Sequence, residues 1–80
     1  MHRIPLESST LASVLYLPQS RELEVEFLSG EIYRYLDVPP QAYWQLLAAP
    51  SRGSYYNFHI RKRFSFLKLN IFTSVQPGSV

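Results

Sequence analysis

The residues best suited to chemistry in this sequence are the basic side chains near its C-terminal end. Residues 51–80 contain five lysines and arginines and no acid, whereas residues 1–50 contain six acids and three bases. The overall charge of +2 is therefore divided into −3 and +5. Such asymmetry indicates an anionic partner. The predicted binding residues are Arg52, Tyr55, Asn57, Arg61, Lys62, Arg63 and Lys68.

This set combines positive charge, an aromatic face and an amide. Nucleic-acid interfaces use the same groups to contact phosphates, stack on bases and bond base edges. Five positive charges give only a modest affinity for nucleic acid, and this affinity falls as the salt concentration rises. We therefore expect an auxiliary binding role. The alternative is an ordinary solvated helix face that pairs with acids of the sheet.

Candidate groups for catalysis or metal binding do not form a recognisable site. His2 and His59 lie far apart, without a second ligand at metal-binding spacing. Ser54, His59 and Asp37 could supply a triad, but no strained nucleophile turn surrounds Ser54. There is no cysteine and no glycine-rich phosphate loop. We therefore expect no enzymatic activity, no metal and no cofactor.

Composition indicates one small globular domain. The 80 residues are 46% hydrophobic and 18% charged, which is too apolar for a disordered chain. No apolar leader follows the first residues, and no run approaches the ~20 apolar residues of a membrane span. We expect a soluble cytoplasmic protein with no membrane contact.

The element that must organise the fold is a hairpin over residues 23–36. Leu23, Val25 and Phe27 alternate with glutamates, as in a half-buried strand, and a Ser-Gly turn signal follows. A two-residue turn and a type I turn with a G1 bulge predict different partners across the strands. The register set by the bulge pairs apolar residues with apolar residues and leaves an opposite-charge pair on the solvent-exposed face of the sheet. We therefore prefer this register. Its predicted pairs are Val25 with Tyr33, Leu23 with Tyr35, and a solvated Glu24 with Arg34, with Gly30 at φ > 0.

The remaining pattern predicts an α+β fold. Residues 11–17 form a first strand, giving a three-stranded antiparallel meander with the hairpin. A helix over 41–49 has Pro40 at its first position, and a second helix begins after Ser54 and extends to Leu67, with Lys68 at its end. The expected order is βββαα in two layers, with residues 1–68 as one domain. Residues 69–80 are expected to be an extension with a short strand and a frayed tail.

The ordered motifs resemble a known family, the KTSC domain. They are Leu23-Glu24-Val25-Glu26-Phe27, Gly30, Tyr33-Arg34-Tyr35, Val38-Pro39, Ser51-Arg52-Gly53-Ser54-Tyr55-Tyr56-Asn57 and Ile60-Arg61. This short domain occurs at the C-terminus of some lysyl-tRNA synthetases and as a free-standing bacterial protein. The resemblance covers about residues 3–68. It implies a possible RNA ligand, with tRNA as a candidate.

The family's Tyr-x-Tyr motif maps onto Tyr33 and Tyr35. Together with Gly30 and Gly53, we interpret these positions as structural, with both rings packed in the core. A platform for stacking unpaired bases is the alternative. A different hypothesis is a protein-interaction or self-association module, in which Trp44, joined by Phe72, forms an exposed apolar patch.

Overall fold

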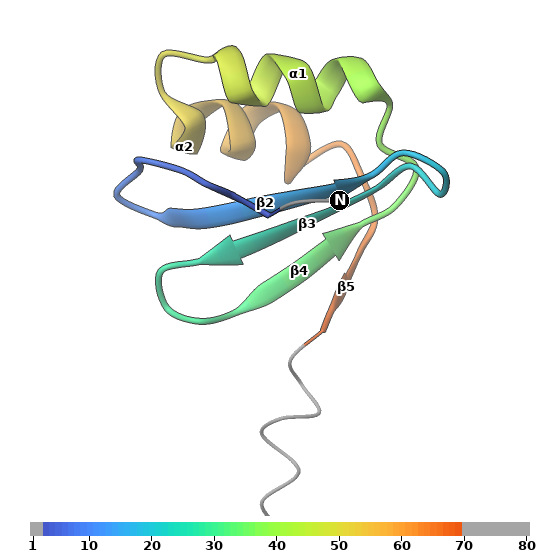
Figure 1. The fold of residues 1–80 in the computed structure, drawn as a ribbon, viewed down its shortest axis with the longest axis horizontal. Helices are drawn as coiled ribbons and strands as arrows, with labels where there is room; N and C mark the ends of the chain where they lie inside the picture. The colour runs from blue at the N-terminus through green and yellow to red at the C-terminus, as the bar shows by residue number, and fades with distance from the viewer. Residues whose placement is uncertain (1–2, 70–80) are drawn as a thin grey trace, which may run out of the picture.

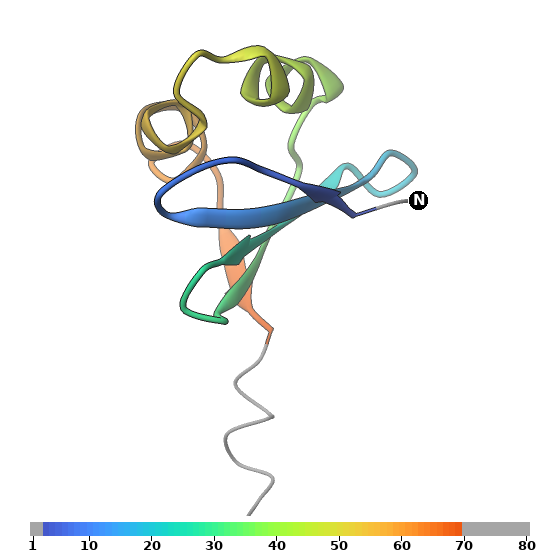
Figure 2. The same ribbon diagram turned by 60° about the vertical axis from the view of Figure 1, so that its left-hand side comes forward.

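The computed structural model describes residues 3–69. One antiparallel sheet has its strands in chain order, and both helices lie on one of its faces (Figures 1 and 2). The elements are β1 (Ile4–Pro5), β2 (Leu11–Leu17), β3 (Glu22–Phe27), β4 (Ile32–Tyr35), α1 (Pro40–Ala48), α2 (Arg52–Tyr55), its continuation η1 (Tyr56–Ile60) and β5 (Phe66–Lys68). The predicted α+β class is confirmed, but the sheet has five strands and not three.

The predicted hairpin register is confirmed. Leu23 pairs with Tyr35, Glu24 with Arg34 and Val25 with Tyr33. The turn is closed by hydrogen bonds from Phe27 N to Glu31 O and from Gly30 N to Phe27 O, both 2.9 Å long. Gly30 has a φ of 99°, a region that L-residues with a Cβ rarely adopt.

We expect Gly30→Val to lower the free energy of unfolding by about 1–2 kcal/mol, the usual cost of a left-handed backbone. No atom lies within 4 Å of a Cβ built at Gly30, so the loss comes from backbone strain and not from a clash. Urea denaturation measures it, with Ser29→Ala in the same turn as the control. Equal stability of the valine variant and the wild type would contradict the conformational argument.

The sequence prediction missed both outer strands. β1 is only two residues long and contains a proline, so it carries no strand pattern. β5 was assigned to the second helix because Leu67 fits a helical stripe. In the structure the chain leaves the helix earlier, and Phe66 pairs with Tyr35 on β4. The Phe66 ring also stacks on Tyr33 at 4.9 Å between centroids. Pairing with the β4 edge therefore overrides the helical period.

The two helices begin at signals that are visible in the sequence. The first is confirmed, with Pro40 as its first residue. The second begins earlier than predicted, because the N-cap is Ser51 and not Ser54: the Ser51 hydroxyl accepts a hydrogen bond from the Ser54 amide. The predicted strand and tail after residue 69 lie outside the described residues.

The core lies between the sheet and the helix layer. On its sheet side, the Tyr16 ring stacks on Tyr43 of α1 at 4.8 Å, and its hydroxyl donates to Val38 O at 2.7 Å. The buried apolar residues are Leu11, Val14, Tyr16, Leu23, Val25, Tyr35, Val38, Tyr43, Leu46, Tyr56 and Ile60. Within residues 3–69, no helix has the length and apolar character needed to cross a membrane.

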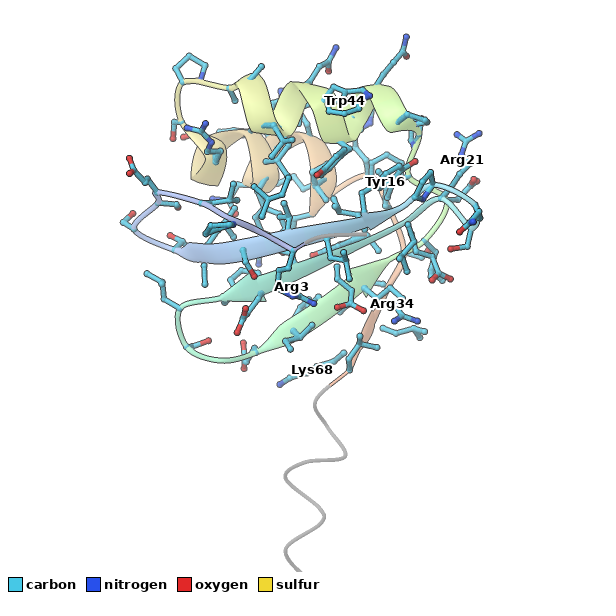
Figure 3. The ribbon with its side chains drawn as sticks, viewed as in Figure 1. Arg3, Tyr16, Arg21, Arg34, Trp44 and Lys68 are labelled. Carbon is cyan, nitrogen blue, oxygen red and sulfur yellow. The ribbon has the colours of Figure 1, made fainter. Side chains whose placement is uncertain are left out.

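The face of the sheet without helices carries an ion network centred on Glu24. Its carboxylate accepts hydrogen bonds from Arg3 and from Arg34, the latter at 2.7 Å, and Arg34 also lies 3.5 Å from Glu22. Figure 3 shows Arg3 and Arg34 along this face of the sheet. The predicted Glu24–Arg34 pair is confirmed, but its carboxylate is not solvated, because Glu24 is only 8% exposed.

Candidate nucleic-acid interface

The continuous helix α2–η1 has one face buried in the core and one face exposed to solvent. Tyr56 and Ile60 lie in the core, while Asn57, Phe58 and His59 are exposed to solvent. Its last turn is a π-turn, closed by the Arg61 N–H to the Tyr56 carbonyl at 2.9 Å. Such wide turns are rare and occur often at functional sites.

The basic cluster, defined here as Arg61, Lys62 and Arg63, follows directly after this turn. All three side chains are exposed, and in the part of the chain that the structure describes no carboxylate forms an ion pair with them. The Lys62 ammonium lies 5.2 Å from the Phe58 ring centroid, which is cation–π geometry. Their position at a helix C-terminus also favours the positive charge, because the helix dipole is negative there.

Two of the predicted binding residues, Tyr55 and Asn57, lie on the helix that precedes the basic cluster. The Tyr55 ring lies 4.5 Å from the His59 ring, and its hydroxyl donates to Gln45 Oε1 at 2.7 Å. Asn57 is exposed. The structure thus places the predicted ring and amide on the helix that leads into the basic cluster, and Phe58 is the ring that contacts a cation of that cluster.

The other two predicted residues have different surroundings. Arg52 lies at the start of α2, where its guanidinium donates to the Leu47 carbonyl at 3.0 Å and so satisfies the end of α1. Lys68 is on β5, 3.2 Å from Glu31, and Figure 3 shows it beside the sheet and not in the helix layer. Neither side chain belongs to the basic cluster.

The motif tyrosines have protein neighbours on the core side of the sheet. Tyr35 is buried and its hydroxyl lies 2.5 Å from that of Tyr56. Tyr33 is half-buried and stacks on Phe66. Gly53 lies inside α2, and a Cβ built there would make ordinary contact with Ser8 Oγ at 3.6 Å.

The Tyr35–Tyr56 pair is neutral at ordinary pH. Burial raises the pKa of Tyr56, and the hydrogen bond that its hydroxyl shares with Tyr35 raises it further, while the nearby charge of Arg61 acts in the opposite direction. Burial also raises the pKa of Tyr35. These phenols therefore act as hydrogen-bonding groups and not as acids or bases.

A shallow hollow opens beside the exposed face of α2–η1. Sequence reasoning missed it because the hollow forms where the connector of residues 49–51 bends into α2–η1, and such a bend has no sequence period of its own, although an exposed Phe58 off the buried stripe was a visible signal. Phe58 is 63% exposed. The hollow has a volume of about 320 Å³ and is lined by Ala49, Pro50, Ser51, Ser54, Tyr55, Phe58 and His59.

Trp44, the residue of the alternative hypothesis, is 62% exposed on α1. Its ring centroid lies 5.2 Å from that of Tyr43, and Figure 3 shows it in the helix layer, far from Arg3 and Arg34. Phe72, its predicted companion, lies outside the described residues.

Comparison with known proteins decides the family. Residues 7–64 match the model of the KTSC domain. This chain belongs to the KTSC domain family. It is similar to a crystal structure of a KTSC domain protein from Yersinia pestis, with a TM-score of 0.80 and 35% identity, covering 85% of this chain and 96% of that one. The resemblance inferred from the motifs is therefore confirmed.

KTSC relatives include both small proteins and a part of larger ones. An uncharacterized protein of Stutzerimonas stutzeri is 49% identical over 57 residues, which are 71% of this chain and 80% of that protein. A lysine–tRNA ligase of Nostoc punctiforme is 36% identical over 64 residues, which are 80% of this chain but only 11% of the ligase. The KTSC domain is thus a small unit that also occurs within tRNA ligases.

Proposed function

We propose that this KTSC domain is a non-catalytic, cytoplasmic module that binds RNA through the end of α2–η1. The observation that carries the proposal is the basic cluster, three exposed cations that have no ion pair within residues 3–69. Arginine and lysine side chains free of carboxylates are available to phosphate oxygens. Asn57, Phe58 and His59 on the preceding helix are also exposed, and the Phe58 ring lies 5.2 Å from the Lys62 ammonium.

The occurrence of a similar region in lysine–tRNA ligases supports RNA as the anion and tRNA as one candidate. A few phosphate contacts give weak, salt-sensitive binding. Such binding suits a module that adds to the RNA affinity of a larger protein or of a second binding site. With three cations engaged on a single strand, the slope of log K against log salt should be roughly −2.

Reversing two charges of the basic cluster, Arg61→Glu with Arg63→Glu, should weaken RNA binding at least about tenfold, because two phosphate contacts become repulsions. Fluorescence anisotropy of bulk tRNA and of a short labelled single strand, at roughly 50 and 200 mM salt, measures this effect. Both side chains are exposed, so the melting temperature should change little.

The matched control is Arg21→Glu with Lys68→Glu, which changes the net charge equally but on the loop after β2 and on β5. It should keep most of the affinity. Unchanged RNA binding in the Arg61/Arg63 variant would remove this surface from consideration. Equal losses in both double variants would mean that only the overall charge matters.

Protein recognition or self-association is the second candidate, and the observation that favours it is the exposed ring of Trp44. Such a function needs a contiguous apolar surface around that ring. Sedimentation and pull-downs test this candidate: a monomer at all concentrations excludes self-association through this face, and failure to bind a partner in pull-downs counts against protein recognition.

A further inference from the structure

Phe58 is an apolar side chain that the fold does not use. It is 63% exposed, as much as any large hydrophobic residue in residues 3–69, and it lies opposite the buried residues of its own helix. A single exposed ring is common on protein surfaces. This ring, however, forms one wall of the hollow beside α2–η1, and Tyr55 and His59 form other parts of its lining.

The hollow has the character of a site for one small planar group. Its volume of about 320 Å³ is at the lower end of the ~300–1,000 Å³ typical of small-ligand sites. The apolar lining includes Pro50 and the Tyr55–His59 ring pair, whose planes are tilted by 32°. Ser51 and Ser54 supply hydroxyl groups at its edge. Flat apolar walls with a few hydrogen-bonding groups suit a nucleobase.

The hollow is joined to the basic cluster through Phe58. Its ring lines the hollow and also lies under the Lys62 ammonium, at 5.2 Å. A planar group stacked on Phe58 would therefore lie close to the Lys62 ammonium, which attracts negative charge attached to that group. This charge complementarity selects an occupant that carries both a flat ring and adjacent negative charge.

We propose that the hollow binds an unpaired base of RNA while the basic cluster contacts the neighbouring phosphates. The inference rests on the proposed function and makes it more specific. The ligand is then a single strand, loop or end, because paired bases in a duplex are stacked on one another and cannot expose a face to Phe58. Phe58 supplies stacking, and the basic cluster supplies affinity that does not depend on sequence.

The test compares three probes with the full chain: a labelled single-stranded RNA, an abasic strand with the same number of phosphates, and a duplex of the same sequence. The wild type should bind the single strand at least about fivefold more tightly than the abasic strand. Phe58→Ser should remove this preference and leave the weaker, salt-sensitive binding. Phe58→Tyr, which retains a ring, should keep it.

Trp44→Ser is the matched control, since Trp44 is 62% exposed and lies on the other helix. It should keep the wild-type preference. Equal affinity of the wild type for the single and the abasic strand overturns the base site but leaves RNA binding by the basic cluster intact. Failure to bind any of the three probes at low salt overturns both. Loss of the preference in Trp44→Ser but not in Phe58→Ser would place base stacking on α1 and also overturn the inference.

Discussion

Replacing Glu24 with glutamine will lower the free energy of unfolding at neutral pH by about 2–3 kcal/mol. Removing one member of a buried ion pair typically costs about 3–5 kcal/mol, and the value is lower here because Arg3 and Arg34 are each about one-third exposed. The carboxylate itself is 8% exposed and bonded to both guanidinium groups. The neutral amide removes the charged partner of Arg3 and leaves Arg34 with only the more distant carboxylate of Glu22.

The same residue makes stability depend on pH. Burial raises the pKa of Glu24, but hydrogen bonds from Arg34 and Arg3 and their charges outweigh burial, so the pKa lies below its ordinary value. The stabilisation is complete above the unfolded pKa of about 4.3 and is lost as pH falls through the lower pKa of the folded protein.

Thermal melting at pH 7 and at pH 3 measures both effects of Glu24. The stability difference between wild type and Glu24→Gln should be large at pH 7 and should shrink at pH 3. Glu7→Gln, at an exposed position, is the control and should follow the wild type at both values. A difference that does not change with pH would show that the lost stability arises from packing and not from charge.

Removing the hydroxyl of Tyr35 will have a comparable effect at the centre of the core. In Tyr35→Phe the buried Tyr56 hydroxyl loses its partner, 2.5 Å away, and an unsatisfied buried hydroxyl costs about 1–3 kcal/mol. Tyr56→Phe should cost a similar amount for the same reason. The double variant leaves no buried hydroxyl without a partner. Its loss in free energy of unfolding should therefore be clearly smaller than the sum of the losses of the two single variants.

A double-mutant cycle with urea denaturation tests this coupling. Tyr55→Phe is the control, because it removes a hydroxyl whose bond to Gln45 is exposed, and it should change stability by less than about 0.5 kcal/mol. Additive losses for Tyr35 and Tyr56 would contradict the coupling. RNA affinity should stay unchanged in the double variant, since neither hydroxyl belongs to the basic cluster.

Local patterns in this sequence predicted the elements that have a period or a turn signal of their own. Alternation around Val25 and the glycine of the turn fixed the hairpin register, because only one register matches apolar pairs and opposite charges. Pro40 predicted the start of α1. β5 could not be predicted in the same way: it has three residues, and its place depends on the open edge of β4 and on Phe66 meeting Tyr33.

The sequence predicted which region of the chain holds the candidate site, but not which of its basic residues belong to it. The excess of bases after residue 50 pointed to the region, and Arg61 remains at its centre. Arg52 and Lys68 could not be separated from it by sequence, because their partners Leu47 and Glu31 are distant along the chain or on another element. Burial of Glu24 was missed because Arg3 was not expected to reach it.

The meander topology gives the strand pairings unequal costs in chain entropy. β1, β2 and β3 each pair with the next strand along the chain across a short loop, whose closure costs little. Pairing of β4 with β5 instead closes a loop of residues 36–65 that contains both helices. The same pairing brings Phe66 onto Tyr33, at 4.9 Å between ring centroids. Among the described strand pairings, that of the fifth strand therefore carries the largest closure entropy, and it depends most on the rest of the domain being in place.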